Sequence, residues 1–172
     1  MITLVLGGAR SGKSAFAERL AGATGRPVVY LATAVVGTDA DFAERVRLHR
    51  ERRPAGWTTV ETGPDLVGAL EATALPAESA VLVDSLGTWV ASHPDFAPDA
   101  AALCRALQAR RGPAVVVSEE VGLGVHPSTE VGGRFRDALG RVNQVVAAAA
   151  DRAYLVVAGR ALSLDSGPGP DR

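Results

Sequence analysis

GGARSGKS, at residues 7–14, is the stretch that decides the expected fold. It directly follows the apolar run at residues 2–6, and its G-x4-G-K-S spacing is that of a phosphate-binding loop between a buried strand and a helix. Such a loop aims several backbone N–H groups and the positive end of the helix dipole at one point, which suits a di- or triphosphate. The residues expected to contact the nucleotide here are Gly7, Gly8, Ala9, Arg10, Ser11, Gly12, Lys13 and Ser14.

Two side chains of this loop carry the expected chemistry. Lys13 would reach the β- and γ-phosphates, and the Ser14 hydroxyl would hold Mg²⁺. Lys13 is also the only lysine among 18 basic residues, so a chain that otherwise uses arginine keeps its one flexible ammonium at this position. This usage favours a phosphate-binding loop over the alternative, an ordinary glycine-rich turn.

Length and composition fit one α/β domain. The 172 residues, 47% of them hydrophobic, are enough for a single core, which we assign to residues 1–165, with a flexible tail at residues 166–172. A net charge of −1 argues against a general binder of nucleic acid or membrane surfaces, which would need a basic field. The single cysteine, Cys104, excludes an intrachain disulfide. Because there is neither a basic leader nor an apolar run long enough to span a membrane, we expect a cytoplasmic protein.

The apolar runs predict a P-loop NTPase fold of the RecA-like kind, a mostly parallel sheet flanked by helices, with a short antiparallel edge. Further buried strands are expected at residues 27–31, 80–85, 113–118 and 153–158, and shorter strands at 57–61 and 160–164. Helices are expected at residues 14–23, 38–53, 64–74 and 99–111, and from Ser128 or Thr129 onward. The apolar positions of the last helix are Phe135, Leu139, Val142, Val145 and Val146. Its arginines either form a solvated face or reach a polyphosphate, namely Arg134, Arg136 and Arg141.

Polar side chains follow three of the expected strands, at the carboxyl edge where ligands bind in open α/β sheets. Asp84 has the position of a Walker B acid that orients water on Mg²⁺, and the alternative is an acid that caps the next helix. Thr33, between Ala32 and Ala34, is either a hydroxyl donor to the ligand or a strand-capping threonine. Glu61 is either an acceptor for a base or ribose edge or an ordinary polar residue at a strand end.

The expected helix at residues 38–53 carries one histidine among several arginines. His49 falls on the same face as Phe42 and Val46, at positions i, i+4 and i+7. It is either a histidine packed at the end of an apolar stripe or a nucleophile, because neighbouring guanidinium groups would keep the ring neutral and hold the phosphates that it attacks. The phosphate-binding loop favours the nucleophile. The surrounding arginines are Arg45, Arg47, Arg50, Arg52 and Arg53.

Several of these stretches together resemble the bifunctional adenosylcobinamide kinase / adenosylcobinamide-phosphate guanylyltransferase family. The resemblance covers nearly the whole chain in register, so it is more specific than the phosphate-binding loop alone. It is carried by GGARSGKS at 7–14, YLATA at 30–34, RVRLHRERRP at 45–54 with Trp57 and Glu61, SEEVGLGVHP at 118–127, RFRD at 134–137 and GRVNQ at 140–144.

The resemblance implies two half-reactions in the assembly of adenosylcobalamin. A nucleoside triphosphate, GTP or ATP, phosphorylates the aminopropanol hydroxyl of the corrinoid adenosylcobinamide. GTP then guanylylates a histidine that corresponds to His49, and GMP passes to adenosylcobinamide phosphate, with pyrophosphate as the other product. The resemblance also implies a homotrimer, and nucleotide contacts at Ala32, Thr33, Ala34, Arg50, Glu51, Arg52, Arg53, Glu61 and Asp84.

Two stretches depart from the pattern of that family. Glu119-Glu120 stands where Asn-Glu is usual, and Ser85-Leu86-Gly87 stands where Cys-Leu-Thr is common after the Walker B acid. Two other functions would use the same loop: a plain small-molecule kinase with an inert His49, and a nucleotide-dependent switch. The only lysine is Lys13, so the chain lacks the Asn-Lys-x-Asp motif with which a regulatory GTPase reads guanine. This absence favours an enzyme over a switch.

Overall fold

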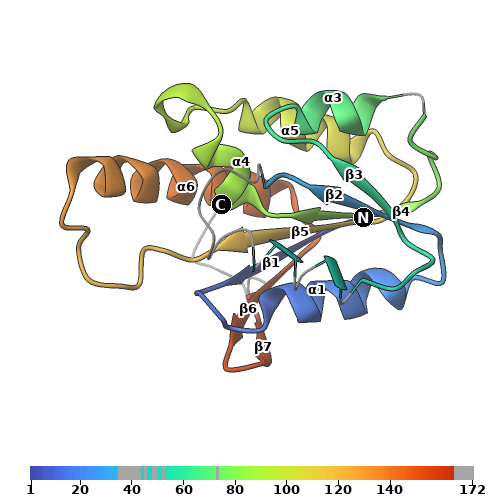
Figure 1. Ribbon diagram of the computed structural model, residues 1–172, viewed down its shortest axis with the longest axis horizontal. Helices are drawn as coiled ribbons and strands as arrows, with labels where there is room; N and C mark the ends of the chain where they lie inside the picture. The colour runs from blue at the N-terminus through green and yellow to red at the C-terminus, as the bar shows by residue number, and fades with distance from the viewer. Residues whose placement is uncertain (35–43, 45, 48–49, 52, 73, 165–172) are drawn as a thin grey trace, which may run out of the picture.

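The computed structural model describes residues 1–34, 44, 46–47, 50–51, 53–72 and 74–164. Within these residues the chain forms a seven-stranded sheet in the order β3-β2-β4-β5-β1-β6-β7 (Figure 1). Each described pair of neighbouring strands is parallel except β6 and β7, which confirms the predicted antiparallel edge. The strands are β1 (Ile2–Gly7), β2 (Val28–Ala32), β3 (Thr58–Glu61), β4 (Ala80–Asp84), β5 (Ala114–Glu119), β6 (Arg152–Val157) and β7 (Arg160–Ser163).

Helices cover both faces of the sheet (Figure 1). Helix α1 lies on one face, and α3, α4, α5 and α6 lie on the other. Strand side chains alternate between the faces, so Leu31 and Val83 join the larger core while Tyr30 and Leu82 pack on the side of α1. The described helices are α1 (Lys13–Gly22), α3 (Leu66–Glu71), α4 (Leu86–Ala91), the 3₁₀ turn η1 (Pro94–Phe96), α5 (Ala100–Gln108) and α6 (Glu130–Ala149).

The ends of two helices show how well local sequence signals predict boundaries. Thr129 caps α6, as expected, by accepting a hydrogen bond from the Gly132 N–H at 3.1 Å. The helix expected at residues 64–74 is shorter in the structure, because Asp65 caps α3 and Ala72 already has an extended backbone. No helix in the described part of the chain is long and apolar enough to span a membrane.

One predicted core position of α6 is wrong. Leu139, Val142 and Val146 are buried, but Val145 is 41% exposed. The buried three follow the spacing i, i+3 and i+7 of one helix face, and Val145 lies outside this face although it is apolar. Asn143, a polar residue that the sequence analysis had not assigned to the core, is buried.

The register of the parallel strands brings their carboxyl ends to one edge of the sheet. Gly7 at the end of β1 is paired with Glu119 at the end of β5. Ala32 at the end of β2 is paired with Asp84 on one side and Glu61 on the other. The phosphate-binding loop and three carboxylates from separate strands therefore share this edge, and the site is built there.

Candidate active site

The phosphate-binding loop is held in shape by close backbone packing. A side chain at Gly7 would bring its Cβ to 2.8 Å from the Val156 carbonyl oxygen, and Gly12 has a φ of +92°. The Ser11 carbonyl accepts a hydrogen bond from the Gly159 N–H at 2.8 Å, so the turn between β6 and β7 supports the loop from behind. Glycine at positions 7 and 12 is therefore a requirement of the loop geometry.

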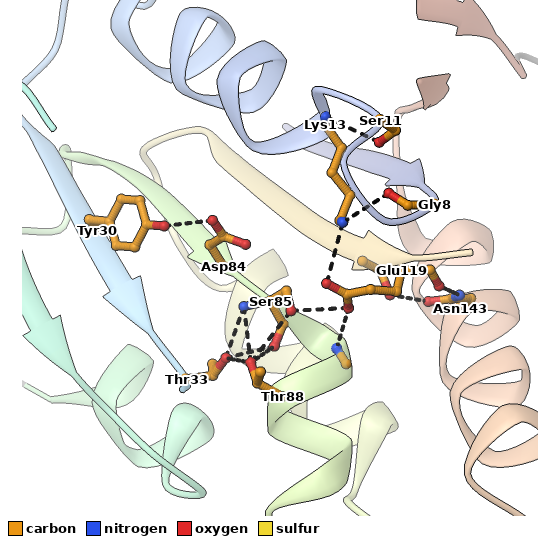
Figure 2. Close-up of polar contacts among 12 residues, drawn as sticks. Gly8, Ser11, Lys13, Tyr30, Thr33, Asp84, Ser85, Thr88, Glu119 and Asn143 are labelled. Carbon is orange, nitrogen blue, oxygen red and sulfur yellow. Dashed lines mark hydrogen bonds and ion pairs between the residues drawn. The ribbon is translucent and has the colours of Figure 1, made fainter. Parts of the chain in front are cut away.

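Lys13 points into the loop that precedes it (Figure 2). Its Nζ donates a hydrogen bond to the Gly8 carbonyl at 3.3 Å and lies 3.6 Å from Oε1 of Glu119. The Lys13 side chain is only 12% exposed, so the ammonium is largely shielded from solvent. Ser14, which follows it in the first turn of α1, is half-buried.

Asp84 is held by a buried tyrosine of the neighbouring strand. The Tyr30 hydroxyl donates a hydrogen bond to Oδ2 of Asp84 at 2.6 Å, and the Arg53 guanidinium lies 3.7 Å from the centre of the Tyr30 ring. Burial, and then the negative charge of Asp84, raise the pKa of Tyr30, so the hydroxyl stays a donor at neutral pH. The N-cap position of α4 is Ser85, the residue after Asp84.

Replacing Tyr30 with phenylalanine should lower the free energy of unfolding by about 1 to 3 kcal/mol, the usual range for a hydrogen bond to a charged group. The stacking with Arg53 is kept in this variant, so the loss reports on the bond to Asp84. Urea unfolding with an unchanged m-value measures it. Tyr154→Phe is the matched control, because the described structure shows its ring against Phe16 and no hydrogen bond from its hydroxyl. Equal losses in the two variants would contradict the role of this bond.

The Thr33 hydroxyl is used inside the protein. It donates to the Ser85 carbonyl at 2.6 Å and accepts from the Ser85 N–H at 2.9 Å, with Oγ1 of Thr88 also at 2.6 Å. Thr33 is fully buried. These contacts join the end of β2 to the start of α4 and favour the strand-capping interpretation over a hydroxyl donor to the ligand. Ala32 is buried beside it and Ala34 is half-buried.

An open pocket of about 540 Å³ lies beside β3. Its lining includes Arg50, Arg53, Trp57 and Glu61, so the structure brings together three of the predicted nucleotide contacts. The Arg50 guanidinium forms an ion pair with the Glu61 carboxylate. The pocket offers an aromatic side chain together with charges of both signs. This lining suits a nucleotide base, which has hydrogen-bond donors and acceptors along its edges.

The predicted nucleophile and two of the arginines around it lie outside the described residues. These are His49, Arg45 and Arg52, so the roles expected of them stay predictions. The described residues 44, 46–47 and 50–51 of this stretch are helical, whereas Arg53 lies in a bend. Glu51 forms an ion pair with Arg47. The expected helix is therefore supported where it can be followed.

Sequence reasoning noted Glu119 only as a departure and missed its place in the site. Its carboxylate accepts hydrogen bonds from the Ser85 hydroxyl and from the Gly87 N–H, each at 3.0 Å (Figure 2). The Glu119 backbone carbonyl accepts a hydrogen bond from the side-chain amide of Asn143 at 3.1 Å. The amide oxygen of Asn143 accepts a hydrogen bond from the Ser118 hydroxyl. Asn143 therefore fixes the end of β5, which explains a buried amide in α6.

The arginines of α6 are used mostly at the surface. Arg134 pairs with Asp95 at 2.7 Å, and Arg136 pairs with Asp137 at 2.8 Å. Arg141 is exposed. These contacts favour the solvated face over contacts to a polyphosphate.

Comparison with known proteins gives the family of the chain. The model of the family "Cobinamide kinase / cobinamide phosphate guanyltransferase" matches residues 3–164. The chain belongs to this family. It is 39% identical to the bifunctional adenosylcobalamin biosynthesis protein CobP of Pseudomonas aeruginosa, over 98% of this chain and 99% of that protein. It is 38% identical to the bifunctional adenosylcobalamin biosynthesis protein CobU of Salmonella typhimurium, over 92% of this chain and 97% of that protein.

Solved structures support the predicted fold of this cobinamide kinase / guanyltransferase family member. The flagellar accessory protein FlaH of Methanocaldococcus jannaschii matches with a TM-score of 0.53 and 14% identity, over 95% of this chain and 77% of that chain. An ATPase of a bacterial type III secretion system matches with a TM-score of 0.57 and 11% identity, over 94% of this chain and 56% of that chain. At these identities the likeness concerns the fold, a P-loop NTPase of the RecA-like kind.

The donor set of this family member fits a metal that arrives with the nucleotide. Among the described residues, no group of three or more histidine, cysteine or acidic side chains could hold a metal ion alone. Ser14 and Asp84 offer a hydroxyl and a carboxylate, which are the hard oxygen donors that Mg²⁺ accepts together with phosphate oxygens and water. The residues present therefore fit Mg²⁺ shared with a triphosphate.

Proposed function

We propose that the protein phosphorylates adenosylcobinamide with a nucleoside triphosphate and then transfers GMP from GTP to adenosylcobinamide phosphate. Membership of the cobinamide kinase / guanyltransferase family supports this function. The observation that carries it is the buried Lys13 ammonium, directed into a complete phosphate-binding loop at the sheet edge that also holds Asp84. This arrangement suits transfer of either a phosphoryl or a nucleotidyl group, because both reactions need a stabilised polyphosphate.

In the kinase half-reaction the chain holds the triphosphate and neutralises charge. The N–H groups of the loop and the Lys13 ammonium would contact the β- and γ-phosphates, and Ser14 and Asp84 would hold Mg²⁺. Mg²⁺ supplies positive charge to the phosphate oxygens. Tyr30 keeps the Asp84 carboxylate turned to one position. The protein needs no covalent intermediate for this step.

In the transfer half-reaction we propose that His49 is the nucleophile. A neutral imidazole nitrogen attacks the α-phosphorus of GTP, the bond to the β-phosphate breaks, and pyrophosphate leaves with its electron pair. The phosphate of adenosylcobinamide phosphate then displaces the imidazole. Arg50, Arg52 and Arg53 would offset the charge of the phosphates, and Glu61 in the neighbouring pocket would accept from the guanine edge. Lys13 would stabilise the leaving pyrophosphate.

Product analysis tests this function. The purified protein is mixed with GTP, Mg²⁺ and adenosylcobinamide, and the corrinoids are separated and identified by mass. We expect adenosylcobinamide phosphate first and adenosylcobinamide-GDP later. Phosphate product alone would support the plain kinase, and slow hydrolysis with tight GDP retention but no corrinoid product would support a switch. Either of these two results would overturn the bifunctional assignment.

A further inference from the structure

Glu119 lies between the phosphate-binding loop and the start of α4. It ends β5, whose neighbours in the sheet are β1 and β4, and it is paired in register with Gly7. Its side chain is 29% exposed, so it is neither in the core nor fully in solvent. A carboxylate at this position faces the same space as the Lys13 ammonium.

The two carboxylate oxygens of Glu119 have different surroundings (Figure 2). Oε2 accepts hydrogen bonds from the Ser85 hydroxyl and the Gly87 N–H, each at 3.0 Å. Oε1 lies 3.6 Å from Nζ of Lys13. One oxygen is therefore fixed by α4, and this holds the other toward the phosphate-binding loop. A bound triphosphate would compete for the Lys13 ammonium, and Oε1 would then be open to another donor.

The departures from the family pattern at these positions act as one unit. Ser85 supplies a hydroxyl to the carboxylate, and Gly87 supplies an N–H. A Cβ at position 87 would come far inside van der Waals contact with Oε2 of Glu119. Glycine at position 87 thus leaves room for the Glu119 carboxylate against the first turn of α4. Three changes that look separate along the sequence meet at one carboxylate.

We propose that Glu119 is the proton acceptor for the corrinoid hydroxyl in the kinase half-reaction. The inference rests on the proposed function above. The hydroxyl oxygen forms a bond to the γ-phosphorus, and its proton moves to Oε1 of Glu119. The bond between the γ-phosphorus and the bridging oxygen breaks, and the electron pair leaves with the nucleoside diphosphate. Asp84 is less suited to this task, because its carboxylate accepts the hydrogen bond from Tyr30 and would also hold Mg²⁺.

This role predicts that the two half-reactions depend differently on Glu119. An attacking hydroxyl must lose a proton, so the kinase step gains from a base. A neutral imidazole attacks through a free electron pair, and a phosphate acceptor attacks through an anionic oxygen, so guanylyl transfer has no such proton to remove. Lys13, by contrast, would serve both steps. A residue that acts only by positioning Lys13 would therefore change both rates.

Glu119→Gln keeps the size of the side chain and removes the base. We expect the kinase rate to fall by about 100-fold or more, within the range usual for a general base. Labelling of the protein by α-labelled GTP should change by less than about twofold, because that step has no proton for a base to remove. Glu119→Asp keeps a carboxylate at this position, so it should retain more of the kinase rate than Glu119→Gln. Among the described residues, the Glu119 carboxylate contacts the charged Lys13 and the uncharged Ser85 and Gly87.

Two control variants make the result decisive. Glu78→Gln removes a carboxylate that pairs with Arg26 and Arg111 before the start of β4, and it should leave both rates unchanged. Glu120→Gln tests the adjacent acid, whose carboxylate accepts from the Gly122 N–H. Equal losses of both half-reactions in Glu119→Gln, or a selective kinase loss in Glu120→Gln alone, would overturn the proposal while the bifunctional assignment stands. If the wild-type protein forms no corrinoid phosphate, the proposal falls together with the proposed function.

Discussion

Lys13→Ala should abolish both half-reactions while the fold stays intact. The loss in each rate should be at least about 100-fold, the usual effect of removing one preorganised donor that stabilises developing charge. The Lys13 side chain contacts only the Gly8 carbonyl and the Glu119 carboxylate among the polar groups of the described residues, so the core does not depend on it. Rates of corrinoid phosphate formation and of protein labelling by α-labelled GTP measure the two effects.

A cation elsewhere on the same helix is the control for Lys13. Arg19 is exposed on α1, with its guanidinium 5.6 Å from the Phe16 ring centre, and Arg19→Ala should leave both rates unchanged. Urea unfolding of both variants separates lost chemistry from lost folding. Should Lys13→Ala lose the kinase rate but keep protein labelling, the lysine would not be the group that stabilises the leaving pyrophosphate.

The parts of the fold that local signals determine could be predicted from the sequence. The phosphate-binding loop, the strand that ends in Asp84 and the antiparallel edge at β7 follow from short stretches with strong turn, apolar or motif patterns. Each is decided by residues that are neighbours in the chain. The sequence also predicted that the loop and Asp84 lie at one edge of the sheet, because parallel strands share one carboxyl edge.

Other parts depend on partners far apart in the sequence, and these were missed. Helix α4 has six residues, which include Gly87 and the β-branched Thr88 and Val90, so its helix propensity is weak. Contacts from Thr33 and from Glu119 hold its first turn. Glu119 lies beside Gly7 because β5 is next to β1 in the sheet, and this strand order cannot be predicted from any local sequence pattern. The site role of Glu119 became visible only with this order.

Replacing His49 with alanine should remove guanylylation of the protein and leave phosphorylation of adenosylcobinamide within about twofold of the wild-type rate, because only the transfer step uses a covalent nucleophile. The label from α-labelled GTP should be acid-labile in the wild-type protein, as a phosphorus–nitrogen bond is, and absent from the variant. His126→Ala is the matched control. That imidazole is exposed in the loop after β5, with Nδ1 2.9 Å from the Pro127 carbonyl oxygen, and its removal should leave labelling unchanged.

The rates of the two half-reactions in His49→Ala together show whether His49 is a nucleophile or a packed structural residue. A packed histidine at the end of an apolar stripe would, when removed, loosen the helix that carries the arginines, and both rates would fall together with the free energy of unfolding. A nucleophile leaves the kinase rate and the stability almost unchanged, because the triphosphate is still held by Lys13 and the loop. Equal loss of both rates would therefore assign His49 to structure. A label that survives in His49→Ala would move the nucleophile to another residue.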